Sequence, residues 1–128
     1  MSYKFSDKSK KRLETCHQYL ILLMNHVIKK IDITILEGHR NEEKQNNYYN
    51  AGKSKLKYPE SKHNKTPSQA VDVALWHKEE PNIRWDDKTD WYYLAGYIES
   101  TAKDLNIPIY WGGRFSNFFD GVHFQLDL

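Results

Sequence analysis

Apolar residues at helical spacing dominate the first part of the chain. After Ser6, a favourable helix N-cap, steps of three and four residues separate the apolar positions Leu13, Cys16, Leu20, Leu23 and Val27. This pattern predicts one amphipathic helix that runs to about residue 29. We expect its apolar stripe to form part of the core.

Two more helices are predicted further along. Asp90 can cap a helix that extends to about residue 105, before Pro108 interrupts it. Its buried face is expected to carry Trp91, Leu94, Ala95, Ile98, Ala102 and Leu105. A short polar helix is predicted over residues 42–50, with Asn41 as its cap and Gly52 as its end.

Period-two alternation predicts short strands between these helices. The alternating segments are residues 31–35, 70–75, 109–111 and 122–128. In the second segment Asp72 lies on the face opposite Val71, and in the last His123 lies opposite Phe124. Helices interspersed with short strands predict an α+β fold, a small and mostly antiparallel sheet flanked by helices, whose strand order stays open.

Residues 52–68 carry little periodicity, two prolines and many polar side chains. We expect a surface loop there, and loops of this length are often functional.

Length, composition and charge limit the class of protein to which this chain can belong. The 128 residues are 39% hydrophobic, so we expect one domain over residues 1–128 with a core that needs no structural metal. The net charge of +2 does not indicate a dedicated nucleic-acid binder. With Cys16 as the one cysteine no internal disulfide forms, and we expect neither a membrane span nor a signal peptide.

A set of metal-ligand residues lies on or beside the predicted strands. His63 lies in the loop before residues 70–75, Asp72 within that strand, and His123 in the last strand. Two imidazoles and one carboxylate suit a catalytic zinc that keeps one position for water. Such a site also needs a general base, and on chemistry alone Asp120 or Asp72 could serve.

Several segments together resemble a family of zinc cell-wall peptidases. They are Ser61-Lys-His63, Gln69-Ala-Val-Asp72, Trp111-Gly-Gly and Asp120-Gly-Val-His123-Phe124, with Gly38-His-Arg40 and Gln45 ahead of them. The family includes vancomycin-resistance D-alanyl-D-alanine carboxypeptidases and phage L-alanyl-D-glutamate endopeptidases. The resemblance covers about residues 36–126 and implies a fold like that of hedgehog and the D-Ala-D-Ala peptidases.

The resemblance also implies roles for individual residues. It implies that His63, Asp72 and His123 hold Zn²⁺ and that Asp120 is the catalytic base. It implies a catalytic and substrate-binding role for Arg40, which would steady the substrate or the developing oxyanion, and a hydrogen bond from Ser61 to the substrate. Many carboxypeptidase members have Glu where this chain has Asp120, which favours the endopeptidase branch. A second departure is the interval from His63 to Asp72, which is two residues longer than the common motif and lacks its glycine.

The function that the resemblance implies is an endolysin-like zinc peptidase that hydrolyses the L-alanyl-D-glutamate bond of peptidoglycan stem peptides. The alternatives are a D-alanyl-D-alanine carboxypeptidase and a zinc-bearing binding module without catalysis. We expect a monomer that is made in the host bacterial cytoplasm and acts on the cell wall. Its release is expected to be aided by a separate membrane-permeabilising protein.

Structural alternatives accompany these assignments. Arg40 could form a surface ion pair with Glu42 or Glu43, and Asp120 could cap the turn before Gly121. A set of aromatic residues could line a substrate cleft, although at helical and strand spacing such residues more often form core. They are Trp76, Trp85, Trp91, Tyr92, Tyr93 and Tyr97.

Overall fold

Four short antiparallel strands, in the order β1-β2-β4-β3, form one sheet in the computed structural model, which describes residues 2–128. The strands are β1 (Ile33–Glu37), β2 (Ala70–Leu75), β3 (Ile109–Trp111) and β4 (His123–Leu126). The α-helices are α1 (Asp7–Glu14), α2 (Gln18–Val27), α3 (Glu42–Asn50) and α4 (Lys88–Asp104), and two 3₁₀ turns are η1 (Lys62–Asn64) and η2 (Gly112–Arg114). The predicted α+β class with an antiparallel sheet is confirmed.

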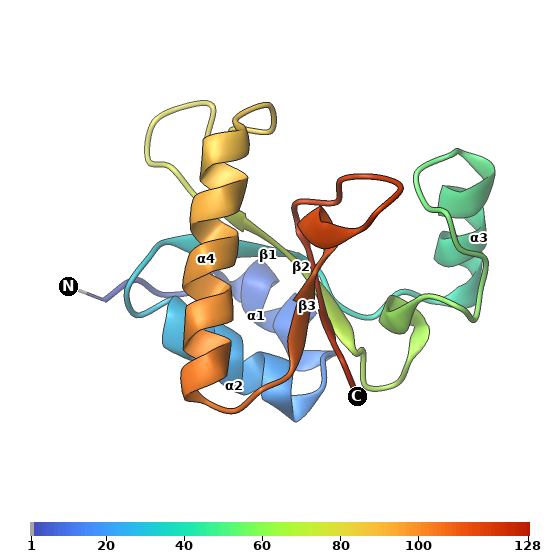
Figure 1. Ribbon diagram of the computed structural model, residues 1–128, viewed down its shortest axis with the longest axis horizontal. Helices are drawn as coiled ribbons and strands as arrows, with labels where there is room; N and C mark the ends of the chain where they lie inside the picture. Colours follow the sequence, from blue (N-terminus) through green and yellow to red (C-terminus); the bar gives the residue numbers. More distant parts are fainter. Residues whose placement is uncertain (1) are drawn as a thin grey trace.

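The helices cover the sheet unequally. Helix α4 packs on β2 and β3, α2 packs against α4, and α1 packs on β1. Helix α3 and the loop after it lie at the opposite end of the molecule from α4, with the sheet between them (Figure 1). The core therefore lies on the side of α2 and α4, and the other side of the sheet is left for a site.

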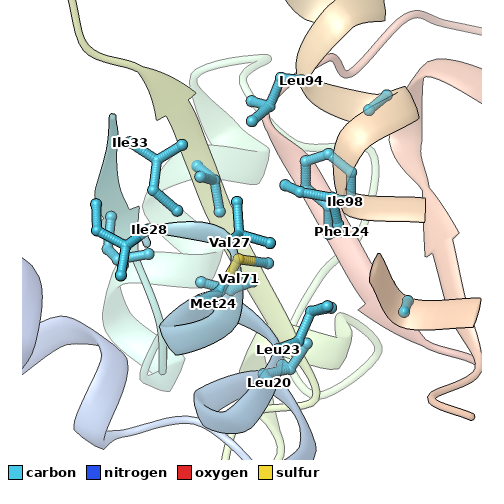
Figure 2. Packing of buried hydrophobic residues seen from close by; sticks show 14 of the residues in the cluster. Leu20, Leu23, Met24, Val27, Ile28, Ile33, Val71, Leu94, Ile98 and Phe124 are labelled. Carbon is cyan, nitrogen blue, oxygen red and sulfur yellow. The ribbon is translucent and has the colours of Figure 1, made fainter. Parts of the chain in front are cut away.

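Side chains from three elements meet in the core. Leu23 of α2, Val71 of β2 and Ile98 of α4 are fully buried and point toward one another (Figure 2). Phe124, on strand β4 of the sheet, belongs to the same cluster and is also fully buried. The alternation in β2 and β4 therefore directs Val71 and Phe124 inward and leaves Asp72 and His123 on the other face.

The single long N-terminal helix predicted from the apolar spacing is wrong, because the chain breaks between α1 and α2. Around this break Cys16 forms a β-bridge with Ser68. The amide of His17 donates to the carbonyl of Ser68, and the amide of Ser68 donates to the carbonyl of Thr15. These tertiary hydrogen bonds replace helical ones, and the stripe stays continuous because both helices face one core.

Other predicted boundaries vary in accuracy. Helix α3, with the Asn41 cap, and strand β2 match their predicted limits. The cap of α4 is Asp87 rather than Asp90, whose Oδ2 instead lies 2.6 Å from Nε2 of His77. Strand β4 ends at Leu126, two residues early. No helix within residues 2–128 has the length and apolar character needed to cross a membrane.

Candidate active site

The three predicted metal ligands converge on the face of the sheet opposite the core. Nε2 of His63 lies 3.1 Å from Oδ1 of Asp72, and Nδ1 of His123 lies 3.5 Å from the same oxygen. One donor atom from each residue lies within 4.8 Å of the other two. His123 and Asp72 are direct partners in the β2–β4 pairing, so the sheet register brings them together.

In each imidazole ring, the nitrogen that points away from Asp72 lies within hydrogen-bond distance of an acceptor. Nδ1 of His63 lies 2.8 Å from the carbonyl oxygen of Gly38, and Nε2 of His123 lies 2.8 Å from Oε1 of Gln125. Carbonyl oxygens can only accept, so each of these ring nitrogens donates, and the other nitrogen, which faces Asp72, is the one that can bind a metal ion once it loses its proton. This arrangement fits zinc, because metal-binding histidines are normally oriented by such a hydrogen bond.

The charges of these residues are coupled. Burial alone would raise the pKa of Asp72, but His63 and His123 hold it well below the usual aspartate value. Burial alone would lower the pKa of His123, but Asp72 and Gln125 hold it above the usual histidine value. Asp72 is thus kept ionised, and its negative charge favours a proton on His123. A metal ion has to displace that proton in order to bind His123.

A capped 3₁₀ turn positions His63. Ser61 accepts a hydrogen bond at Oγ from the amide of His63, at 3.2 Å, and its own amide donates to Oδ1 of Asn64, at 3.1 Å. The turn is tied to the segment before α3, since the amide of Arg40 donates to the carbonyl of His63. Ser61 therefore holds the ligand turn, and its expected contact with substrate stays a prediction.

Asp120 lines the same cleft as the three ligands. Among residues 2–128 its carboxylate makes no hydrogen bond, so the alternative role as a side-chain cap has no contact to support it. A Cβ at Gly112 would clash with the Asp120 backbone and with His123, so glycine allows η2 to pack closely against both. Burial and the charge of Asp72 raise the pKa of Asp120, which makes its carboxylate a stronger base.

Arg40 is buried rather than exposed. Its Nε and Nη2 donate to Oε1 of Glu37 at 3.1 and 2.6 Å, and its Nη1 donates to Oε1 of Gln45 at 2.9 Å. The guanidinium also lies 4.6 Å from the ring centroid of Tyr48, and Nη2 lies 3.8 Å from Oδ2 of Asp72. The alternative of a surface ion pair with Glu42 or Glu43 is wrong, because these contacts hold Arg40 at the cleft.

Sequence reasoning assigned no role to three residues that support this site, although Gln45 belongs to the segments that carry the resemblance. Glu37 reaches it through a register shift in β1, which no sequence pattern showed. Gln45 is fully buried and bonds Arg40, Asn64 and the loop after α3, although it lies on a polar helix without an apolar stripe. Gln125 could have been found from the sequence, because strand alternation places it on the same face as the expected ligand His123.

The cleft around these residues has a volume of about 850 Å³. Its lining includes three lysines and three aromatic residues: Lys53, Lys55, Lys62, Trp85, Phe115 and Phe118. Of the aromatic residues proposed above for a cleft, Trp85 lines it.

Others of that aromatic set lie elsewhere. Trp91 is buried in the core, whereas Trp76, Tyr92 and Tyr93 are exposed. The set therefore divides between cleft, core and surface rather than forming one wall.

Comparisons with known proteins agree with this geometry. A family model described as phage L-alanyl-D-glutamate peptidase matches residues 1–126. The crystal structure of the L-Ala D-Glu endopeptidase ChiX of Serratia marcescens superposes with a TM-score of 0.81 at 24% identity, over 96% of this chain and 90% of that one. At that identity the superposition establishes the fold. No curated protein matches the sequence.

Proposed function

Because the chain belongs to the phage L-alanyl-D-glutamate peptidase family, whose members act on peptidoglycan, we propose that its cleft cleaves this bond with zinc held by His63, Asp72 and His123. The observation that carries the proposal is the convergence of two imidazole nitrogens and a carboxylate in one cleft. When bound, zinc supplies Lewis acidity of the kind that polarises an amide carbonyl and acidifies water.

Asp120 is the general base in this proposal. Its carboxylate takes a proton from the attacking water and delivers it to the nitrogen of the departing D-glutamate. The C–N bond then breaks to give a carboxylate on L-alanine and a free amine. Its raised pKa and the lack of a hydrogen-bond partner among the described residues support this role.

Arg40 holds the substrate. A guanidinium has five N–H donors, and Glu37 and Gln45 accept three hydrogen bonds from it. The remaining donors are available to the substrate carbonyl or to the oxyanion that develops from it. Ser61 still has its hydroxyl hydrogen for the substrate, because its Oγ acts as acceptor in the turn that carries His63.

We also propose that residues 1–128 work as one peptidase domain and as a monomer. A phage wall enzyme is made in the host cytoplasm, whereas its substrate lies outside the membrane. We propose release through a separate membrane-permeabilising protein because the enzyme and its substrate lie on opposite sides of the membrane.

Product analysis on purified peptidoglycan tests the function. Wild type is expected to release fragments with new N-terminal D-glutamate, to lose activity with a chelator and to regain it with zinc. His123→Ala is expected to lose zinc. Asp120→Ala is expected to keep zinc and to lose roughly 100- to 10,000-fold in rate.

Three outcomes contradict the proposal. Release of free D-alanine alone would reassign the bond to the carboxypeptidase type. Undiminished cleavage by Asp120→Ala would remove the general base. A zinc-loaded wild type that releases no fragment would leave only a zinc-bearing binding module.

A further inference from the structure

A second hollow lies on the outer surface of α4, outside the candidate active site. We call it the α4 groove. Its volume is about 490 Å³, within the size range of small-ligand pockets. Its lining residues are Tyr92, Ala95, Gly96 and Glu99 of α4, with Trp111, Gly113 and Arg114.

One end of the α4 groove is aromatic. Tyr92 is 57% exposed, and its ring lies 5.3 Å from that of Trp111 and 6.1 Å from that of Phe119, centroid to centroid. The Trp111 and Phe119 rings are 5.6 Å apart and perpendicular. These contacts fix the Tyr92 ring at the surface, although it is not buried in the core.

The other end is polar. Nε and Nη2 of Arg114 donate to the two carboxylate oxygens of Glu99, each at 2.8 Å. Arg114 is exposed and Glu99 is partly exposed, and this forked pair leaves further N–H groups and oxygen lone pairs for a ligand. The groove thus joins an apolar surface to a fixed set of donors and acceptors.

Gly96 keeps the groove open. It lies inside α4, where glycine is unfavourable for a helix, and a Cβ added there would meet no atom within 4 Å. The packing of the fold therefore does not require glycine at this position. A larger side chain would instead project into the groove.

The α4 groove and the candidate active site lie on either side of turn η2. Turn η2 contributes Gly113 and Arg114 to the groove, and its first residue, Gly112, packs against Asp120 and His123. Phe119, which contacts Tyr92, directly precedes Asp120. A single 3₁₀ turn therefore separates the two sites.

We propose that the α4 groove binds an amino sugar of the peptidoglycan glycan strand while the attached stem peptide occupies the cleft. This inference rests on the proposed function. The L-alanine of the scissile bond is joined to a sugar through its nitrogen, so the glycan lies one residue from that bond. A sugar ring presents C–H groups that pack on aromatic rings and hydroxyl and acetamido groups that bond a carboxylate and a guanidinium, which matches the two ends of the groove.

Two substrates and three variants test this inference. The substrates are a glycan-linked stem peptide and the same peptide without sugar. Gly96→Leu fills the groove and Tyr92→Ala removes its aromatic surface. Tyr93→Ala is the matched control, because Tyr93 is 55% exposed on the same helix turn but lies outside the groove.

Gly96→Leu and Tyr92→Ala are expected to raise KM for the glycan-linked substrate about 3- to 10-fold, the range of one aromatic contact. Their kcat/KM on the sugar-free peptide and the behaviour of Tyr93→Ala on both substrates are expected to match wild type. Equal losses on both substrates would show a structural role, and no loss on either would show that the groove binds no substrate. Both results overturn the proposal.

A titration with an oligomer of N-acetylglucosamine, followed by NMR, separates this inference from the proposed function. Wild type is expected to show shifts at the Trp111 indole and at Gly113, and Gly96→Leu is expected to lose them. These shifts are expected even if the zinc-loaded enzyme cleaves neither substrate, a result that would overturn the proposed function alone. Absence of shifts in wild type, or self-association through the groove, would overturn the sugar site.

Discussion

Glu37 lies directly opposite Asp72 in the β1–β2 pairing, although regular alternation from Ile35 would direct it to the core. The register shifts between Ile35 and Glu37, and such a bulge turns the following side chain to the other face. On that face Oε1 of Glu37 accepts from Arg40, and Oε2 lies 2.6 Å from Nζ of Lys44. One bulge therefore decides where the buried arginine of the cleft points.

Replacing Glu37 tests this relationship. Glu37→Gln keeps the size of the side chain but removes the charge that orients Arg40. We expect kcat/KM for peptidoglycan fragments to fall roughly 10- to 100-fold, because misplacement of a substrate-holding group by about 1 Å costs that much. Glu42→Gln, at an exposed position in the first turn of α3, is the control and is expected to match wild type. Equal activity of the two variants would mean that Arg40 does not depend on Glu37.

The hydrogen bond from His123 to Gln125 predicts an effect on metal affinity. Gln125→Leu removes the acceptor at Nε2 of His123 but no metal ligand. Loss of such an outer partner typically weakens metal binding about 10- to 100-fold. Competition with a chromophoric chelator measures this change. Asp127→Asn, on the same face but beyond the end of β4, is expected to bind zinc like wild type, and an unchanged affinity in Gln125→Leu would contradict the role.

The raised pKa of Asp120 predicts a gain in stability when its charge is removed. A carboxyl whose pKa is higher in the folded state than its reference of 3.8 costs stability above that folded value, and the cost vanishes as the pH falls to 3.8. We therefore expect metal-free Asp120→Asn to unfold at a higher temperature than metal-free wild type at pH 7. Thermal unfolding over pH 4–7 should show the difference shrinking toward pH 4. A lower Tm at pH 7 would show that the carboxylate stabilises the fold.

Cys16 is expected to be unreactive in the folded protein. Its side chain is 3% exposed, and burial raises its pKa to about 12, so almost no thiolate forms at pH 8. Mass spectrometry should find no adduct after brief treatment with iodoacetamide and one adduct after unfolding in guanidinium. Rapid modification without denaturant would mean that the contact between Cys16 and Ser68 opens readily.

Patterns of polar and apolar residues in the sequence predicted the structure correctly where contacts within one element determine it. Alternation in β2 and β4 predicted that Asp72 and His123 face away from the core, and the polar segment after Asn41 predicted α3 with its correct limits. The N-terminal stripe predicted the buried face but not the break at Thr15–His17. That break depends on hydrogen bonds to Ser68, more than fifty residues away in sequence.

By itself, the sequence determined which residues could form a core and which donors could bind a metal, because spacing within an element and side-chain chemistry are local properties. Only the tertiary structure decided how those donors are oriented. The acceptor for His63 is the carbonyl of Gly38, 25 residues away in sequence, and the bulge that directs Glu37 toward Arg40 depends on pairing with β2. Contacts between distant segments set these positions, and no periodicity within one segment encodes them.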